Sequence, residues 1–172
     1  MRNFVDRRKK SFEINRPDFY KAMEHRNFDE MADIYNEMMR YDDLAATNGM
    51  DRYFFAEVLD GYVIKLPTNA VSFIRRMEND FYYILTDSYI LYDVDEYPVK
   101  DGETDVTLNF LKQDNVEVTK AVLAGDTIPF TTTAVKTLNL SVGDIMEITL
   151  FDNDCFEICK FERPLSQIYR SE

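Results

Sequence analysis

Apolar residues recur at helical spacing through the first third of the chain. Pro17 stands where the first turn of a helix tolerates proline, and the residues after it predict a short helix over 18–25. Asn27 has the position of an N-cap, with Glu30 three residues later as in a capping box. A second helix is therefore predicted over 28–47. Its apolar positions are Phe28, Met31, Ala32, Tyr35, Met38 and Met39.

Beyond residue 52 the pattern changes to short β segments, and these segments repeat. A shift of 64 positions superimposes nine identical residues without a gap. The identical pairs are Val58/Val122, Leu59/Leu123, Gly61/Gly125, Ile64/Ile128, Thr68/Thr132, Ala70/Ala134, Val71/Val135, Asp80/Asp144 and Ile84/Ile148. Each copy predicts a strand, a glycine turn, a second strand, a short helix that begins at threonine, and a hairpin.

These patterns predict an α+β protein in four parts. The parts are a basic N-terminal arm and helical segment over 1–50, a first β unit over 51–94, an acidic connector with a hairpin strand over 95–115, and a second β unit and tail over 116–172. Val106 to Leu111 of the connector is expected to pair with the first strand of the second unit.

If the two copies pair about a pseudo-twofold axis, equivalent apolar residues should be buried alike. The pairs expected to be equivalent are Ile64 with Ile128, Val71 with Val135, and Ile84 with Ile148.

The two cysteines, Cys155 and Cys159, lie in the last alternating segment of the second copy. Their spacing puts both side chains on one face of a strand, where a disulfide between them is disfavoured because they are too far apart. We expect both to be buried as small apolar residues.

The net charge of −12 is placed unevenly. Residues 1–52 are nearly balanced, so the excess of carboxylates lies in 53–172. A negative field repels phosphate backbones and attracts basic surfaces, although solubility alone would also account for it.

Neither a secretory signal nor a membrane span is predicted. The basic start of the chain has no apolar segment behind it, and the longest apolar runs, such as Phe81 to Leu85, are far shorter than the roughly 20 residues that a bilayer requires. A cytoplasmic location and no membrane partner are the expectation.

The second copy resembles the swapped-hairpin domain of AbrB-type and MazE-type proteins. The likeness covers about a quarter of the chain, VTKAVLAGDTIPFTTTAVKTLNLSVGDIMEITLFDNDCFEICKF. The residues that carry it are Gly125, Ile128-Pro129, Leu138-Asn139-Leu140, Val142-Gly143-Asp144 and the final hairpin. The first copy matches through Gly61, Ile64, Pro67 and Asp80, and the segment from Pro129 to Leu138 is about two residues longer than the family's spacing.

Members of this family pair two such units from two chains into one barrel. The resemblance therefore implies that the two units of this chain form an intrachain pseudo-dimer barrel with the N-terminal helices attached. A further homodimer, formed by domain swapping, stays an open alternative.

The residues at the family's DNA-contacting position depart from its pattern. DNA-binding members carry a basic residue after the first glycine, where this chain has Asp126 and Tyr62. Losing that cation weakens duplex binding, which depends on phosphate neutralisation. Because the family also contains acidic antitoxins that bind a protein toxin, the departure favours a protein partner.

Two sets of residues are candidate contacts. A basic protein partner is expected to meet carboxylates at the hairpin ends, namely Asp93, Asp95, Glu96, Asp152 and Asp154. The alternative, an AbrB-type transcription regulator, would use the basic arm Arg2, Arg7, Arg8, Lys9 and Lys10, although an arm docked on the acidic part of the chain is the favoured interpretation of this cluster.

Catalytic and metal chemistry find little support. His25 has no evident serine or cysteine partner, and no phosphate-binding glycine motif occurs, so no cofactor is expected. Asp101, Glu103 and Asp105 have the spacing of a calcium loop but lack its glycine. A third reading is a carboxylate enzyme, in which the hairpin-end carboxylates would hold Mg²⁺. We expect a non-catalytic binding protein.

Overall fold

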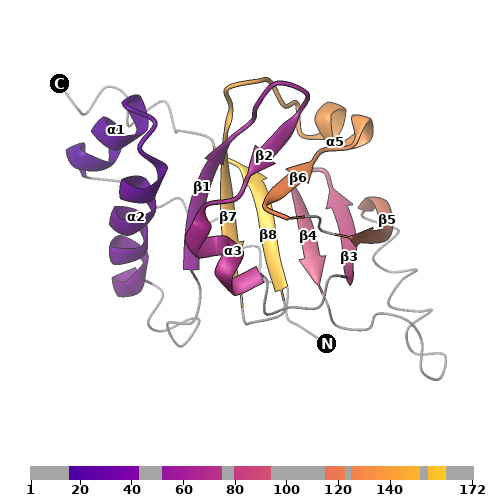
Figure 1. The fold of residues 1–172 in the computed structure, drawn as a ribbon, viewed down its shortest axis with the longest axis horizontal. Coiled ribbons are helices and arrows are strands. Elements are labelled where there is room, and N and C mark those ends of the chain that lie inside the picture. The colour runs from indigo at the N-terminus through magenta and orange to yellow at the C-terminus, as the bar shows by residue number, and fades with distance from the viewer. Residues whose placement is uncertain are drawn as a thin grey trace.

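The structure is a computed structural model, and it describes residues 16–42, 52–74, 80–93, 115–122, 125–151 and 155–161. Within these ranges the chain forms N-terminal helices followed by antiparallel β-structure (Figure 1). The prediction of an α+β protein is confirmed.

Both predicted N-terminal helices are present, as α1 (Pro17–Glu24) and α2 (Phe28–Asp42). The capping box between them forms as expected: Asn27 Oδ1 accepts from the Glu30 amide at 3.2 Å, and Asn27 Nδ2 donates to Glu30 Oε2 at 3.0 Å. Residues 43–47 of the predicted second helix lie outside the described residues.

The β part contains the same order of elements twice. The first half comprises β1 (Arg52–Glu57), β2 (Val63–Lys65), α3 (Thr68–Ile74), β3 (Asp80–Thr86) and β4 (Tyr89–Asp93). The second half comprises β5 (Asn115–Val122), β6 (Thr127–Pro129), α5 (Thr132–Thr137), β7 (Ile145–Leu150) and β8 (Cys155–Lys160). The repeated strand–strand–helix–hairpin pattern of the sequence is therefore reproduced in both halves.

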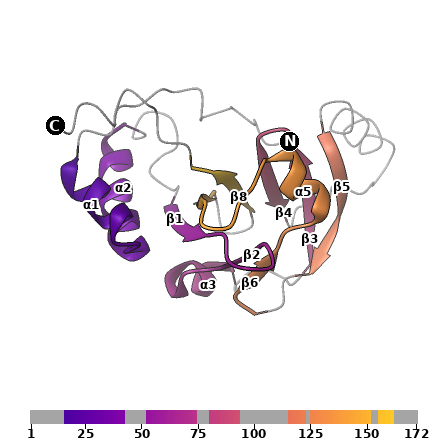
Figure 2. The same ribbon diagram turned by 90° about the horizontal axis from the view of Figure 1, so that it is seen from above.

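Strands of both halves combine in the same sheet and in the same ribbon. Six strands form one antiparallel sheet in the order β1-β7-β8-β4-β3-β5, and β2 and β6 form a separate two-stranded ribbon. Figure 2 shows that this ribbon lies over one face of the sheet. Among the described residues β1 and β5 are outer strands that do not pair with each other, so the sheet is open and the expected closed barrel is not confirmed.

The ribbon places two equivalent isoleucines opposite each other. Ile64 of β2 and Ile128 of β6 are partners in its register, and their side chains are 0% and 1% exposed. The expectation that they are equivalent inward residues is confirmed. Val71 is buried and Val135 is partly buried against the same core, so this second pair is less alike.

The expected equivalence of Ile84 and Ile148 is wrong. Ile148 pairs with Ile158, Ile158 pairs with Ile90, and Ile90 pairs with Leu85 across the sheet, so these four residues share one face and the main core. Ile84, the neighbour of Leu85, points to the opposite face and packs with Leu91 in a second, smaller cluster. Leu85 therefore takes the place that the repeat assigned to Ile84.

The reason for this error lies in the sequence of β3. Every residue from Tyr83 to Thr86 is buried, so the strand has no alternation of polar and apolar residues to say which face points to the main core. The two hairpins also differ in length, with two residues between β3 and β4 and four between β7 and β8. A one-residue offset moves every side chain of a strand to its other face.

The helices pack beside β1 at one side of the sheet (Figures 1 and 2). The Tyr35 ring meets the rings of Tyr53 and Phe55 edge to face at 5.1 and 5.2 Å, and Phe19 also contacts Phe55. Such pairs contribute roughly 0.5–1.5 kcal/mol each beyond their buried area. Both faces of β1 are thereby buried.

Asn36 of α2 closes part of the outer edge of β1. Its carboxamide donates to the Tyr53 carbonyl at 2.8 Å and accepts from the Tyr53 amide at 2.7 Å, as a neighbouring strand would. Unpaired edge groups invite association with another strand. These two hydrogen bonds therefore hold α2 against β1 and also shield this part of the edge from pairing with another strand.

Truncation of the two ribbon isoleucines should test their equivalence. We expect Ile64→Ala and Ile128→Ala each to lower the free energy of unfolding by about 2–5 kcal/mol, and by similar amounts, because both leave a cavity in the same core. Urea denaturation measures this, with Val142→Ala as control because Val142 is 50% exposed. A large cost at one position alone would contradict the pseudo-twofold arrangement.

Graded substitution of Asn36 should separate its two hydrogen bonds to the Tyr53 backbone. Asn36→Asp retains the acceptor for the Tyr53 amide and loses the donor, whereas Asn36→Ala loses both. We expect Asn36→Ala to cost about 1–3 kcal/mol, because partly buried backbone groups of Tyr53 are left unpaired. Thermal melting and hydrogen exchange at the Tyr53 amide should show faster exchange in the alanine variant than in the aspartate variant.

Candidate functional site

The residues predicted as acidic contacts belong to two chain segments, and these segments continue directly from two strand ends that lie side by side. β4 ends at Asp93, which is paired with Cys155, the first residue of β8. Partners in antiparallel strands are about 4.5–5.5 Å apart between Cα atoms. The Asp93 side chain, together with Asp95, Glu96, Asp152 and Asp154, lies outside the described residues, but the segments that contain them continue from these adjacent ends.

A stack of buried aromatic rings supports this end of the sheet. Tyr92, next to Asp93, stacks on Phe156, next to Cys155, with ring centroids 4.6 Å apart and an interplanar angle of 7°. The Tyr83 ring meets Tyr92 edge to face at 5.6 Å. Burial raises the pKa of the Tyr92 phenol, which keeps it neutral. The two strand ends are thus held side by side by rigid side chains.

The two glycine turns lack the cation that DNA-binding swapped-hairpin proteins place there. Tyr62 follows Gly61, has a positive φ of 56°, and is 37% exposed. Asp126 follows Gly125, and its carboxylate lies 3.9 Å from Lys65 Nζ across the ribbon. Lys65 is therefore engaged by a carboxylate of the other half.

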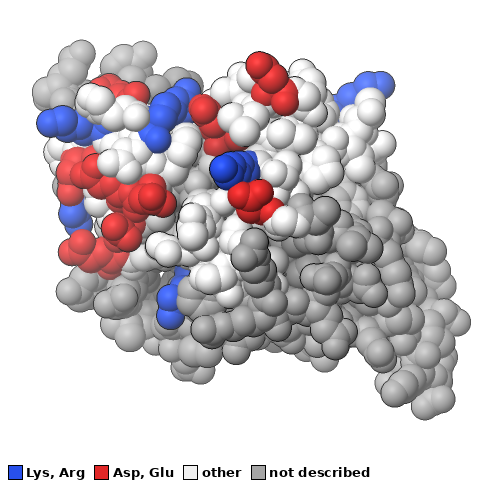
Figure 3. All heavy atoms as spheres, viewed as in Figure 1, with Lys and Arg blue, Asp and Glu red and all other residues white. Residues whose placement is uncertain are grey.

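A second acidic surface was missed by the sequence analysis. Asp29, Glu30, Asp33 and Glu37 of α2 are all exposed, and Figure 3 shows carboxylates gathered over the helices. The net charge of residues 1–52 does not reveal this surface, because the cations of the first ten residues offset the charge of its carboxylates. The helical spacing of the four carboxylates was the signal that could have revealed it.

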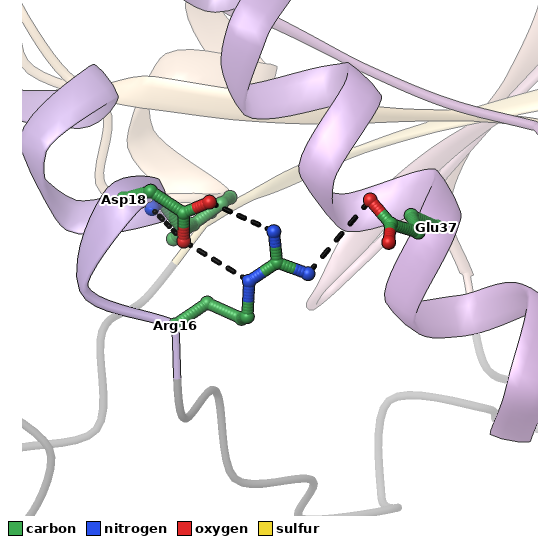
Figure 4. A network of polar contacts seen from close by, with 4 residues as sticks. Arg16, Asp18 and Glu37 are labelled. Carbon is green, nitrogen blue, oxygen red and sulfur yellow. Dashed lines mark hydrogen bonds and ion pairs between the residues drawn. The ribbon is translucent and has the colours of Figure 1, made fainter.

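Arg16 joins the two helices next to this surface (Figure 4). Its Nε and one terminal nitrogen donate to the two Asp18 carboxylate oxygens at 3.0 and 2.8 Å, and its other terminal nitrogen lies 3.8 Å from Glu37. The hydrogen bonds from Arg16 lower the pKa of Asp18, and those to Asp18 raise the pKa of Arg16. The network is exposed, so it orients α1 against α2 with little effect on stability.

A small polar cluster lies beneath the helices. Cys159 is a buried thiol, and its Sγ lies 3.7 Å from Glu147 Oε2. The Tyr35 phenol also bonds to Glu147, and burial together with that carboxylate raises its pKa, so it acts as a donor. Burial of Cys159 is as predicted, while the side chain of Cys155 lies outside the described residues.

The remaining candidates have no described metal or catalytic partner. His25 ends α1, is exposed, and its Nδ1 is 2.8 Å from the Lys21 carbonyl, so it caps the helix. Within the described ranges no three His, Cys, Asp or Glu side chains gather as metal ligands. The calcium-like loop Asp101, Glu103 and Asp105, the strand Val106 to Leu111, and the arm Arg2, Arg7, Arg8, Lys9 and Lys10 lie outside the described residues.

A comparison with protein-family models gives no match, and neither does a comparison with curated proteins. In the described part of the chain, no helix has the length and apolar character needed to cross a bilayer.

The Arg16–Asp18 pair should produce a pH-dependent effect. Because the pKa of Asp18 is lowered in the folded protein, its contribution to stability is present above the ordinary carboxyl pKa and is lost as the pH falls through the lowered value. We expect Asp18→Asn to lower the melting temperature slightly at pH 6, with the difference from wild type vanishing as pH falls from about 4 towards 2. Asp33→Asn is the control, and an equal pH dependence in both variants would refute the assignment.

Proposed function

We propose that this chain is a non-catalytic acidic binding protein, antitoxin-like or inhibitor-like, whose partner is a protein with a basic surface. The observation that carries the proposal is the pairing of Asp93 with Cys155, from which two carboxylate-bearing segments continue. In this proposal Asp93, Asp95, Glu96, Asp152 and Asp154 form one contact surface.

The architecture that we propose for this function is an intrachain pseudo-dimer of swapped-hairpin units. It is supported by the repeated element order and by the cross-half pairing, in which Ile64 meets Ile128 and β4 meets β8. Because β4 and β8 are antiparallel, the last residue of β4 lies beside the first residue of β8, so the acidic segment after β4 and the acidic turn before β8 adjoin the same end of this strand pair.

Electrostatics favours a protein partner over a duplex. A net charge of −12 repels phosphates at long range, and the turn positions carry Tyr62 and an Asp126 that already faces Lys65. The alternative of a DNA-binding regulator relies on the arm Arg2, Arg7, Arg8, Lys9 and Lys10. Cations confined to one short arm would have to offset the field of the rest of the chain.

Charge reversal with a position-matched control tests the proposal. The tagged chain, its Asp152→Lys/Asp154→Lys variant and its Asp29→Lys/Asp33→Lys variant are used to capture proteins from a lysate of the encoding organism. Both variants change the net charge by the same amount, but Asp29 and Asp33 lie on α2 and do not belong to the proposed contact residues. We expect the first variant to weaken binding of the captured partner about tenfold or more and the second to leave it nearly unchanged.

Four further results would bear on the proposal. The captured protein should be basic, and its association rate should fall as salt is raised because charge steering mainly speeds encounter. Equal losses in both variants would show that net charge alone matters, which contradicts the assigned surface. Sequence-selective, salt-dependent binding to duplex DNA that the arm substitutions abolish would replace the proposal with the regulator.

A further inference from the structure

The sheet has a second face, opposite the ribbon, that is buried beyond the described helices. Residues that alternate with the main-core isoleucines along their strands point to this face. One row of strand partners crosses it, and its members are Tyr53, Thr149, Glu157, Leu91 and Ile84. Thr149, Leu91 and Ile84 are only 8%, 3% and 2% exposed. The helices pack at the β1 end of this row, where Tyr35 contacts Tyr53.

The far end of this face is a small apolar cluster. In the described part of the chain, Ile84 and Leu91 are packed against by Tyr89 of β4 and by Phe151, which directly follows β7. Side chains on one face of a sheet lie beside each other and do not cover each other from above. The burial of Ile84 and Leu91 within a single chain therefore requires a further segment of that chain.

The middle of the same face is acidic. Glu157 of β8 lies in the row described above, and Glu147 of β7 lies in the next row, between Phe55 and Cys159. Both carboxylates are half-buried. Because removing a carboxylate from water is costly unless it is paired, a segment over this face should bring cations as well as apolar side chains.

Charge distinguishes the segments that could cover this face. The arm, residues 1–15, contains five Lys or Arg and two Asp or Glu. The connector 94–114 contains two and six, and the tail 162–172 contains two of each. The arm alone is positively charged, and it also contains apolar side chains at Phe4 and Val5. It therefore matches both properties of the face.

The arm begins at the right place and is long enough. Arg16 precedes α1, whose Phe19 contacts Phe55 of β1 and Phe161 after β8 on this same face. β3 is the fourth strand counted from β1, so Ile84 lies roughly 19 Å across the sheet. Residues 4–15 span about 40 Å when extended, which is enough to cross it.

We propose that the arm packs across the face opposite the ribbon. The cations of its basic run lie beside Glu147 and Glu157, and Phe4 and Val5 cover Ile84 and Leu91. The order of the residues supports this path: going away from Arg16 the arm has the run Arg7 to Lys10 and then Val5 and Phe4, while going away from β1 the face has its two carboxylates and then its apolar cluster. The arm cations are then engaged within the chain, so the arm must be released before it can bind phosphates.

Two neighbouring residues of β4 test the cover. Ile90 and Leu91 are both buried, but on opposite faces. In full-length chains with Cys155→Ala and Cys159→Ala, a single Leu91→Cys or Ile90→Cys reports the exposure of its face by its rate of reaction with a maleimide. We expect Phe4→Asp/Val5→Asp to speed labelling about tenfold or more at Leu91→Cys and to leave Ile90→Cys protected. Equal acceleration at both positions, or none at Leu91→Cys, would overturn the proposal.

Matched substitutions in the other two segments identify the occupant. Val106→Asp/Leu108→Asp alters the connector, and Leu165→Asp/Ile168→Asp alters the tail. We expect neither to speed labelling at Leu91→Cys. Acceleration by one of these variants in place of the arm variant would assign the cover to that segment and contradict the proposal.

Limited proteolysis tests the charge contacts. Trypsin cleaves after Arg and Lys, so the cleavage rate within the run Arg7 to Lys10 of the full-length chain, followed by mass spectrometry, reports how well the arm is held. We expect Glu157→Gln to raise this rate about two- to fivefold, and Asp33→Asn on the acidic face of α2 to leave it unchanged. The reverse result would place the arm on α2, and an unchanged rate in both variants would remove the charge contacts. Either result would refute the proposed path.

Discussion

The pairing of strands from one half with strands from the other is the constraint on which the rest of this structure depends. β1 and β5 are each attached to the hairpin of the opposite half, and Ile64 faces Ile128 across the ribbon. The aromatic packing of the N-terminal helices depends on it in turn, because Tyr53 and Phe55 are held in place by the pairing of β1 with β7. A chain with one half unfolded would therefore lose the site and the helix contacts together.

The parts of the fold that local chemistry determines could be predicted from the sequence. Pro17, the Asn27–Glu30 capping box and the glycine turns act within a few residues, and the elements that they predict are present. The choice between the two faces of β3 could not be predicted, because Ile84 and Leu85 are both buried and neither periodicity nor the repeat distinguishes them. Whether the sheet closes also depends on contacts between distant strands, and no local pattern encodes these.

The same distinction, between features set by local sequence and features set by contacts between distant strands, applies to the candidate site. The sequence places carboxylates in the segment after β4 and in the turn before β8, but Asp93 is brought beside Cys155 by the register of β4 against β8, which is a property of the folded chain. For the acidic face of α2 the sequence contained the signal, but the prediction did not use it. Its carboxylates were visible in the sequence, but a charge count over a whole segment cannot show that Asp29, Asp33 and Glu37 lie along one exposed helix face.

The residues that hold the halves together are distinct from those that would meet a partner. The main core consists of buried apolar side chains such as Ile128, Ile148 and Phe156. The charge of the side chains in the connecting turns takes no part in its packing. Tyr62 and Asp126, at the two glycine turns, do not belong to this core, so the charge that a turn side chain carries is set separately from the apolar packing. In the proposed swapped-hairpin architecture, this separation lets one scaffold carry an acidic surface where DNA-binding proteins carry a basic one. On that proposal, the chemistry of the strand ends and turns, and not the fold itself, decides the class of partner.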